Sequence, residues 1–216
     1  MKVSTRHEPR GGESSTAQPV ARFYHEKRQI MMVKIKPGEV YVSSRNELIT
    51  TNLGSCIAAC IWDPELSIGG MNHLMLSHAH ENTARNSTTF GAGSARTAKY
   101  GDVAMGMLIA QLIERGAMKH RLKVKLFGGG QVMGQFSSIG HDNVVFALQY
   151  IKDAGLSLMG SDLGGQVTRQ LMFEPTSGRA WVRRFPAILH PAQARAGASH
   201  QSQPRRGCQD KEISAC

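Results

Sequence analysis

Short apolar runs separated by turn residues dominate the chain after residue 30. They lie at residues 32–35, 40–43, 48–51, 55–62 and 71–76. Pro37-Gly38 and Arg45-Asn46 separate the first three runs, and residue pairs of this kind mark turns. The run at 55–62, SCIAACIW, contains no charged residue, as expected for a strand covered on both faces. This part of the chain is therefore predicted to form strands.

Helical spacing of apolar residues appears from residue 100 on. The first predicted helix has an apolar stripe formed by Tyr100, Val103, Ala104, Met107, Leu108 and Leu112. Gly116 suits the cap at its C-terminal end. A second helix is predicted over residues 144–154, and either Asp142 or Asn143 serves as its N-cap.

Further strands are predicted between and after the helices. One covers residues 124–127 and runs into three glycines, and a hairpin of 170–173 and 180–183 surrounds the turn 175–178. Strands outnumber helices, and the two types do not alternate strictly. This order favours an α/β layered sandwich, with mixed β-sheets flanked by helices, over a doubly wound parallel sheet.

The two ends of the chain lack hydrophobic periodicity. Residues 1–29 are predicted to be a disordered N-terminal extension, and residues 189–216 a disordered basic C-terminal tail. The folded domain is expected to cover residues 30–188. A single domain of this size can form a core without disulfides or a structural metal.

The chain is basic, with 26 Lys and Arg against 16 Asp and Glu and a formal net charge of +10. About half of this excess lies in the two ends, and aromatic residues make up only 6%. Nucleic-acid binding is therefore not expected, whereas attraction to an acidic protein or membrane surface stays open. Arg121, Lys123 and Lys125 alternate along one predicted strand and are interpreted as its solvated face.

No targeting signal, membrane span or cofactor motif is evident. The four cysteines form no C-x-x-C pair, and the N-terminus has no apolar signal region, so a cytoplasmic location is expected. His73, His78 and His80 lack acidic neighbours and a shared helical face, so no metal site is predicted. His78 and His80 are interpreted as exposed loop residues.

Cys56 is the candidate nucleophile, because Leu53-Gly54-Ser55-Cys56 places its thiol at a tight glycine turn. Backbone N–H groups of Gly54 and Ser55 could stabilise an oxyanion there. The base would be His73, if the runs 55–62 and 71–76 form adjacent strands. The alternatives are a buried structural cysteine and an ordinary core histidine.

A hydroxyl on the preceding strand could orient the imidazole or bind substrate. Thr50 and Thr51 are adjacent, and either register fits. Ordinary β-propensity also explains both residues.

These residues resemble the CheD family of chemoreceptor glutamine deamidases. The similarity rests on Thr-x-x-Leu-Gly-Ser-Cys, on Ile-Gly-Gly-Met-Asn-His-Leu-Met-Leu, and on flanking signatures between residues 30 and 185. These signatures are Tyr100-Gly101-Asp102, Phe127-Gly128-Gly129, Gly140 with Asn143, Asp162-Leu163-Gly164-Gly165 with Arg169, and Pro175-Thr176-Ser177-Gly178-Arg179.

The resemblance implies a fold similar to the catalytic domain of cytotoxic necrotizing factor toxins. It also implies hydrolysis of glutamine side-chain amides on the cytoplasmic helices of chemoreceptors, and the same machinery could cleave glutamyl methyl esters. Cys56 then acts as nucleophile and His73 as base, and Thr50 is favoured over Thr51 as the third residue. No metal or organic cofactor is implied.

The expected partners are chemoreceptor helices and, as a further possibility, a CheC-type phosphatase, with the chain itself a monomer. The alternative function is that of a non-catalytic chemotaxis regulator, which binds chemoreceptors or such a phosphatase. An intact motif is compatible with both functions, because family members combine them.

Overall fold

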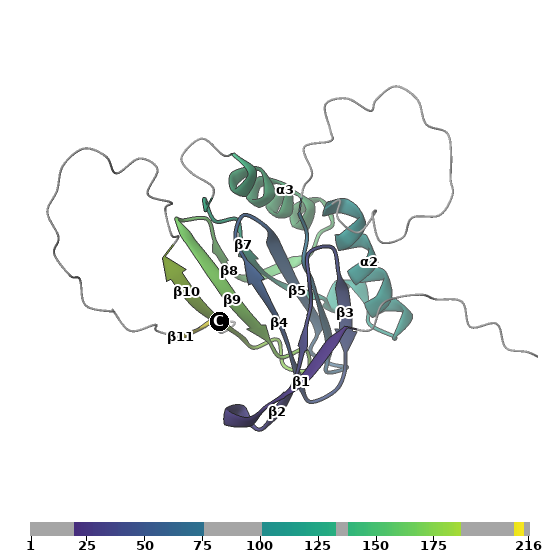
Figure 1. Cartoon of the computed structure of the whole chain (residues 1–216). Helices are drawn as coiled ribbons and strands as arrows, with labels where there is room; N and C mark the ends of the chain where they lie inside the picture. Colours follow the sequence, from purple (N-terminus) through teal and green to yellow (C-terminus); the bar gives the residue numbers. More distant parts are fainter. Residues whose placement is uncertain (1–19, 76–100, 133–137, 187–209, 214–216) are drawn as a thin grey trace, which may run out of the picture.

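The structure, a computed structural model, describes residues 20–75, 101–132, 138–186 and 210–213 of the chain. These residues form two β-sheets and two α-helices (Figure 1). Sheet A has the strand order β1-β2-β4-β9-β10-β11. Its strands are β1 (Ala21–His25), β2 (Ile30–Lys34), β4 (Glu47–Leu53), β9 (Val167–Phe173), β10 (Ala180–Pro186) and β11 (Asp210–Ile213).

Sheet B has the order β3-β6-β5-β7-β8. Its strands are β3 (Val40–Ser43), β5 (Ile57–Asp63), β6 (Ile68–Asn72), β7 (Lys123–Gly128) and β8 (Ser157–Leu163). The pairs β2–β4 and β7–β8 are parallel, and the other paired strands are antiparallel. Both sheets are therefore mixed, and the predicted α/β layered sandwich is confirmed.

The helices α2 (Gly101–Glu114) and α3 (Ile139–Asp153) cover only one of the two sheets. Both pack on sheet B, where a large apolar core joins helix residues such as Leu108 to strand residues such as Ile61. A second core fills the space between the sheets and includes Ile49, Leu53 and Phe127. Within the described residues, no helix covers the outer face of sheet A, which carries a small cluster of Met32, Leu48 and Met172.

Strand parity follows from this layering. In β4, Ile49 and Leu53 point into the core between the sheets, so Thr51, which lies between them, points the same way. Leu48 belongs to the outer cluster, so Thr50 and Asn52 point outward. The two adjacent threonines therefore face opposite sides of sheet A.

The expected limits of the folded domain were too narrow at both ends. β1 lies within the N-terminal segment expected to be disordered, and β11 lies within the C-terminal tail. β1 pairs antiparallel with β2 over five positions, and β11 pairs with β10 over four. An edge strand is held by main-chain hydrogen bonds, which require no hydrophobic periodicity, so the pattern did not reveal these strands.

The interpretation of Lys125 as a solvated residue was wrong. Its side chain is 1% exposed, and its Nζ donates a hydrogen bond of 2.9 Å to the carbonyl of Gly178. The ammonium also lies 5.4 Å from the centroid of the Trp62 ring. β7 is covered by helices on one side and by sheet A on the other, so neither of its faces is solvated. Arg121 lies before the strand, in the short helix η3 (Lys119–Arg121).

Other differences are local. α3 begins at Ile139, earlier than the predicted start, and Ser138 occupies its N-cap position. β8 was not predicted, because SLMGSDL shows no regular alternation and its pairing with β7 contains a bulge. His78 and His80 lie outside the described residues.

Candidate active site

The candidate nucleophile lies where the chain crosses from sheet A to sheet B. β4 ends at Leu53 and β5 begins at Ile57, so Gly54, Ser55 and Cys56 form the connection. Cys56 is partly exposed, whereas the strands on either side are almost wholly buried. The crossover places the thiol at the rim of the sandwich, which a substrate can reach.

Three hydrogen bonds hold the carbonyl oxygens of this turn. The N–H of Gly130 donates to Gly54 at 2.8 Å, and the N–H of Gly129 donates to Cys56 at 2.9 Å. Between them, Nδ2 of Asn143 donates to the Ser55 carbonyl at 2.7 Å. Among the described residues, the N–H groups of Ser55 and Cys56 have no main-chain acceptor, and the N–H of Cys56 faces its own sulfur. The turn is thus fixed through its carbonyls, and its N–H groups make no main-chain hydrogen bond within the described part of the chain.

The pairing of β5 with β6 places Cys56 and His73 on the same face of sheet B. Ile57 and Leu74 exchange both main-chain hydrogen bonds, at 3.0 and 2.8 Å, and Ile57 and Leu74 both point toward the helices. Cys56 and His73 consequently point to the opposite face, toward sheet A. In this register they are diagonal neighbours, at a backbone separation of about 7–8 Å that an imidazole side chain can span.

The imidazole of His73 is held by Thr51 from the facing sheet. Oγ1 of Thr51 lies 2.8 Å from Nδ1 of His73 and 2.9 Å from the carbonyl oxygen of Ile35. A carbonyl only accepts, so the single hydroxyl hydrogen of Thr51 goes to Ile35. Oγ1 must then accept from Nδ1–H of His73, which leaves Nε2 of the neutral ring as the unprotonated nitrogen.

Nε2 of His73 is available to accept a proton. It is buried and has no hydrogen-bond partner among the described residues. Burial lowers the pKa of His73 to about 4, and burial also raises the pKa of the Cys56 thiol, partly offset by its own backbone N–H. The resting pair is therefore a neutral imidazole and a neutral thiol at pH 7.

The preference for Thr50 as the orienting hydroxyl was wrong in its geometry. Oγ1 of Thr50 donates to the carbonyl of Leu171 at 2.7 Å, on the outer side of sheet A. Thr51 is the residue that contacts His73. The physical reason is strand parity, because only every second residue of β4 faces sheet B.

Asn143 is a site residue whose role the sequence did not indicate. It was considered as a helix cap and as part of a family signature, yet it lies just after the first turn of α3, is fully buried, and holds the Ser55 carbonyl. The glycines after β7 were interpreted as a strand exit. The structure adds that two of them donate hydrogen bonds to the turn of Gly54, Ser55 and Cys56, which we call the nucleophile turn. Both groups belong to the family signatures, which was the only available signal.

An ion-pair cluster around the buried carboxylate of Asp162 lies beside this turn. Arg169 of β9 and Arg184 of β10 both bind the carboxylate of Asp162 on β8, at 3.0 and 2.6 Å. The two guanidinium groups hold the pKa of Asp162 below its usual value, despite burial. Arg169 also donates to the carbonyl of Gly164, whose own N–H binds Gly128. The cluster thus joins both sheets to the glycine segment that supports Cys56.

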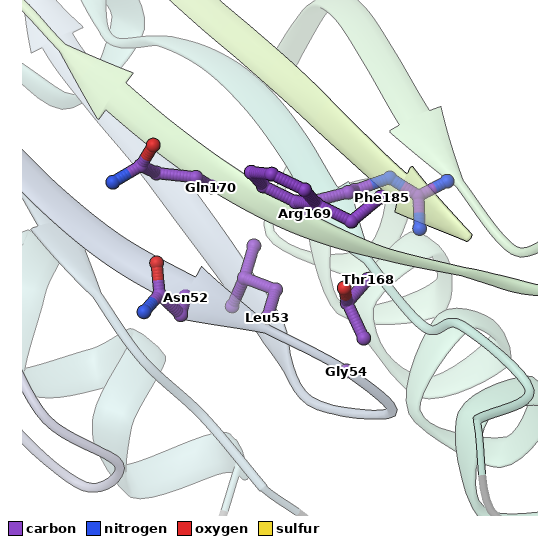
Figure 2. A pocket seen from close by; sticks show the side chains of 7 residues that line it. All are labelled: Asn52, Leu53, Gly54, Thr168, Arg169, Gln170 and Phe185. Atoms are coloured by element: carbon purple, nitrogen blue, oxygen red, sulfur yellow. The ribbon is translucent and has the colours of Figure 1, made fainter. Parts of the chain in front are cut away.

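A hollow of about 400 Å³ lies next to the nucleophile turn (Figure 2). Its lining comes from the ends of three strands of sheet A and from the turn itself. The lining residues are Asn52, Leu53, Gly54, Thr168, Arg169, Gln170 and Phe185. The hollow gives the turn an open neighbour on the side of sheet A.

The described residues contain no group of three or more His, Cys, Asp or Glu side chains placed to hold a metal ion. None of the helices in the described ranges is long and apolar enough to cross a membrane.

Comparison with solved structures gives a weak likeness. A crystal structure of the Bacillus licheniformis hypothetical protein YfiH is 12% identical, with a TM-score of 0.36. The match covers 57% of this chain and 50% of the other. The expected similarity to the cytotoxic necrotizing factor catalytic domain stays a prediction.

Comparison with protein families and curated proteins is decisive. A family model described as CheD chemotactic sensory transduction matches residues 75–184. A probable chemoreceptor glutamine deamidase CheD of Vibrio vulnificus (strain YJ016) is 48% identical over 168 residues, which cover 77% of each chain. Proteins with the same description are 43% identical in Vibrio cholerae, covering 76% of this chain and 70% of theirs, and 40% identical in Halorhodospira halophila, covering 77% and 76%. The chain therefore belongs to the CheD family.

Proposed function

We propose that this chain hydrolyses the side-chain amide of chemoreceptor glutamines to glutamate, with Cys56 as nucleophile and His73 as general base. Its CheD relatives are described as chemoreceptor glutamine deamidases. The observation that carries the mechanism is the hydrogen bond from Nδ1–H of His73 to Thr51. It leaves Nε2 free to take a proton on the sheet face that also bears Cys56.

In the first step, Nε2 of His73 removes the thiol proton as the sulfur attacks the amide carbon. Burial favours the neutral pair at rest, so the thiolate forms together with the attack rather than before it. The carbonyl oxygen of the substrate becomes an oxyanion, and the N–H groups of Ser55 and Cys56 are the donors placed to bind it. Thr51 keeps the imidazolium oriented by accepting from Nδ1.

The imidazolium then gives its proton to the departing nitrogen, and ammonia leaves with formation of a thioester on Cys56. Water attacks the thioester carbon, and Nε2 of His73 takes one of the water protons. The C–S bond breaks, the thiol recovers its proton, and the substrate is released as glutamate. The net reaction consumes one water and releases one ammonia.

The same steps would hydrolyse a glutamyl methyl ester, with methanol in place of ammonia as the leaving group. The substrate helices of chemoreceptors are cytoplasmic, so we propose that the protein acts in the cytoplasm. We also propose that it acts as a monomer. A CheC-type phosphatase is a further proposed partner.

The test is conversion of glutamine to glutamate in a chemoreceptor cytoplasmic fragment, followed by mass spectrometry and by ammonia release. Wild type should convert specific glutamines. Cys56→Ala should abolish conversion while still binding the fragment, as measured by sedimentation. Cys60→Ala is the matched control, because Cys60 is fully buried in the core between the sheets and should keep activity.

Equal conversion by wild type and Cys56→Ala would refute the mechanism. Binding of the fragment by a wild-type protein that converts nothing would favour the non-catalytic regulator instead.

A further inference from the structure

The outer face of sheet A carries a trough that ends at the nucleophile turn. A hollow of about 630 Å³ lies over β1, β2, β4, β9 and β10. It shares Asn52 and Gln170 with the hollow of about 400 Å³ that is lined by Gly54. Because the two hollows share lining residues, they adjoin and form one depression, which we call the basic trough; Figure 2 shows its smaller part.

The charge of the basic trough is of one sign. Lys27, Arg28, Lys34 and Arg183 line the larger hollow, whereas Arg169 in the smaller one is buried and paired with Asp162. Neither lining contains an aspartate or a glutamate. Lys27 and Lys34 are exposed, so their ammonium groups are available to a bound molecule. A concave surface lined by one sign of charge attracts ligands of the opposite sign.

The floor of the basic trough mixes apolar and polar side chains, because Thr50, Asn52 and Gln170 line it together with Met32 and Met172. Met32 and Met172 are nearly buried in it, and Phe23 is 43% exposed at its side. Methionine side chains adapt to different apolar partners. Basic rims beside the exposed Phe23 and the two methionines suit an amphipathic helix that carries carboxylates beside its apolar stripe.

The chain's own flanking segments do not match this surface. Residues 187–209 contain Arg195, Arg205 and Arg206 and no acidic residue, and residues 1–19 contain three Lys or Arg against two Glu. Like charges would repel both segments from the basic trough. Charge therefore favours a separate, acidic partner.

We propose that the basic trough is the docking surface for an acidic amphipathic helix of the substrate protein, which it guides to Cys56. This inference rests on the proposed function, because the partner is the deamidation substrate. Gly54 lines the near end of the trough and lies two residues before Cys56, so a helix seated there ends beside the turn that carries the thiol. The trough supplies affinity and selection of the substrate, and the turn supplies the chemistry.

The experiment measures steady-state conversion of a chemoreceptor cytoplasmic fragment by the full chain and by Lys27→Glu/Lys34→Glu. Reversal of two exposed charges should raise KM about tenfold at low salt, with kcat within about twofold, because rim charges act mainly on encounter and binding. The difference in KM should shrink in 0.5 M salt, because screening shortens the range of attraction between surface charges to about 4 Å. Lys152→Glu on α3 is the control, since its exposed side chain lies on the opposite side of the molecule.

A second readout separates the trough from the chemistry. Alkylation of Cys56 by iodoacetamide should proceed at the same rate in wild type, Lys27→Glu/Lys34→Glu and Lys152→Glu. If wild type converted the fragment but the double variant matched Lys152→Glu in KM, the docking proposal would fail while the proposed function stood. Absence of conversion by wild type would instead overturn the proposed function.

Two other occupants would also overturn the proposal. One is an anionic membrane, shown by sedimentation with phosphatidylglycerol vesicles that the double variant loses while its KM is unchanged. The other is a second copy of the chain, shown by a wild-type dimer in analytical ultracentrifugation that the double variant dissociates with KM unchanged.

Discussion

Oγ1 of Thr51 accepts a hydrogen bond from Nδ1–H of His73 at 2.8 Å and donates one to the carbonyl oxygen of Ile35. The two bonds together determine which nitrogen of the imidazole is free, because the hydroxyl has only one hydrogen to give. Thr51 lies on a strand of sheet A and His73 follows a strand of sheet B, so the packing of the two sheets sets the tautomer of His73.

Replacing Thr51 with valine should therefore impair catalysis while preserving shape. Thr51→Val removes the acceptor for Nδ1–H, and the ring loses both its orientation and its preferred tautomer. We expect kcat for receptor deamidation to fall by about 10- to 100-fold, at the low end of general-base contributions. Thr50→Val is the matched control, since Thr50 bonds to Leu171 instead. Equal loss of kcat in both variants, at matched thermal stability, would contradict this role of Thr51.

The lowered pKa of His73 predicts a specific acid sensitivity of folding. The folded-state pKa is about 4, against 6.5 for the ordinary residue. Between these values the unfolded chain binds a proton at this residue that the folded chain does not, so the free energy of unfolding falls as pH decreases. The contribution is complete above pH 6.5 and is lost as pH falls toward 4, by up to about 3 kcal/mol.

Urea unfolding between pH 7 and pH 4 checks this prediction. His73→Gln should lose less stability over that interval than wild type, because glutamine does not titrate. His120→Gln, at an exposed position in η3, should follow the wild-type curve. Parallel curves for wild type and His73→Gln would show that His73 titrates normally in the folded protein.

Asn143 should act as a positioning residue for the nucleophile turn. Asn143→Ala leaves the Ser55 carbonyl without its side-chain donor, which costs about 1–3 kcal/mol of stability for a buried group. Loosening of the turn should lower kcat and slow the alkylation of Cys56 by iodoacetamide, with little change in KM. Gln149→Ala, on an exposed position of the same helix, should change none of the three. If Asn143→Ala lost stability but kept the wild-type kcat, Asn143 would have a purely structural role.

Gly128 should tolerate no side chain. Its φ is 115°, and an added Cβ would collide with the carbonyl oxygen of Cys56. Gly128→Ala should therefore displace the nucleophile turn and abolish most of the reactivity of Cys56 toward iodoacetamide. Gly155→Ala is the control, because Gly155 also has a positive φ, of 66°, but its added Cβ would meet no atom within 4 Å. It should cost only about 1 kcal/mol, measured by urea unfolding, and leave Cys56 fully reactive.

Much of the fold followed from local patterns. The strands of the first third and the hairpin near the C-terminus were recognisable because each is bounded by turn residues and carries its own apolar run. The edge strands β1 and β11 were not, because they depend on a neighbouring strand rather than on their own composition. Lys125 shows the same limit, since its burial depends on a covering sheet that is distant in the sequence.

The candidate site divides along the same line. The Gly54-Ser55-Cys56 turn, His73 on the following strand and membership of the CheD family were all readable from contiguous residues. Tertiary structure decided between Thr50 and Thr51, brought Asn143 to the turn, and joined two hollows into the basic trough. The physical reason is that adjacent residues of a strand face opposite sides, and only the packing of one sheet against the other decides which side meets the histidine.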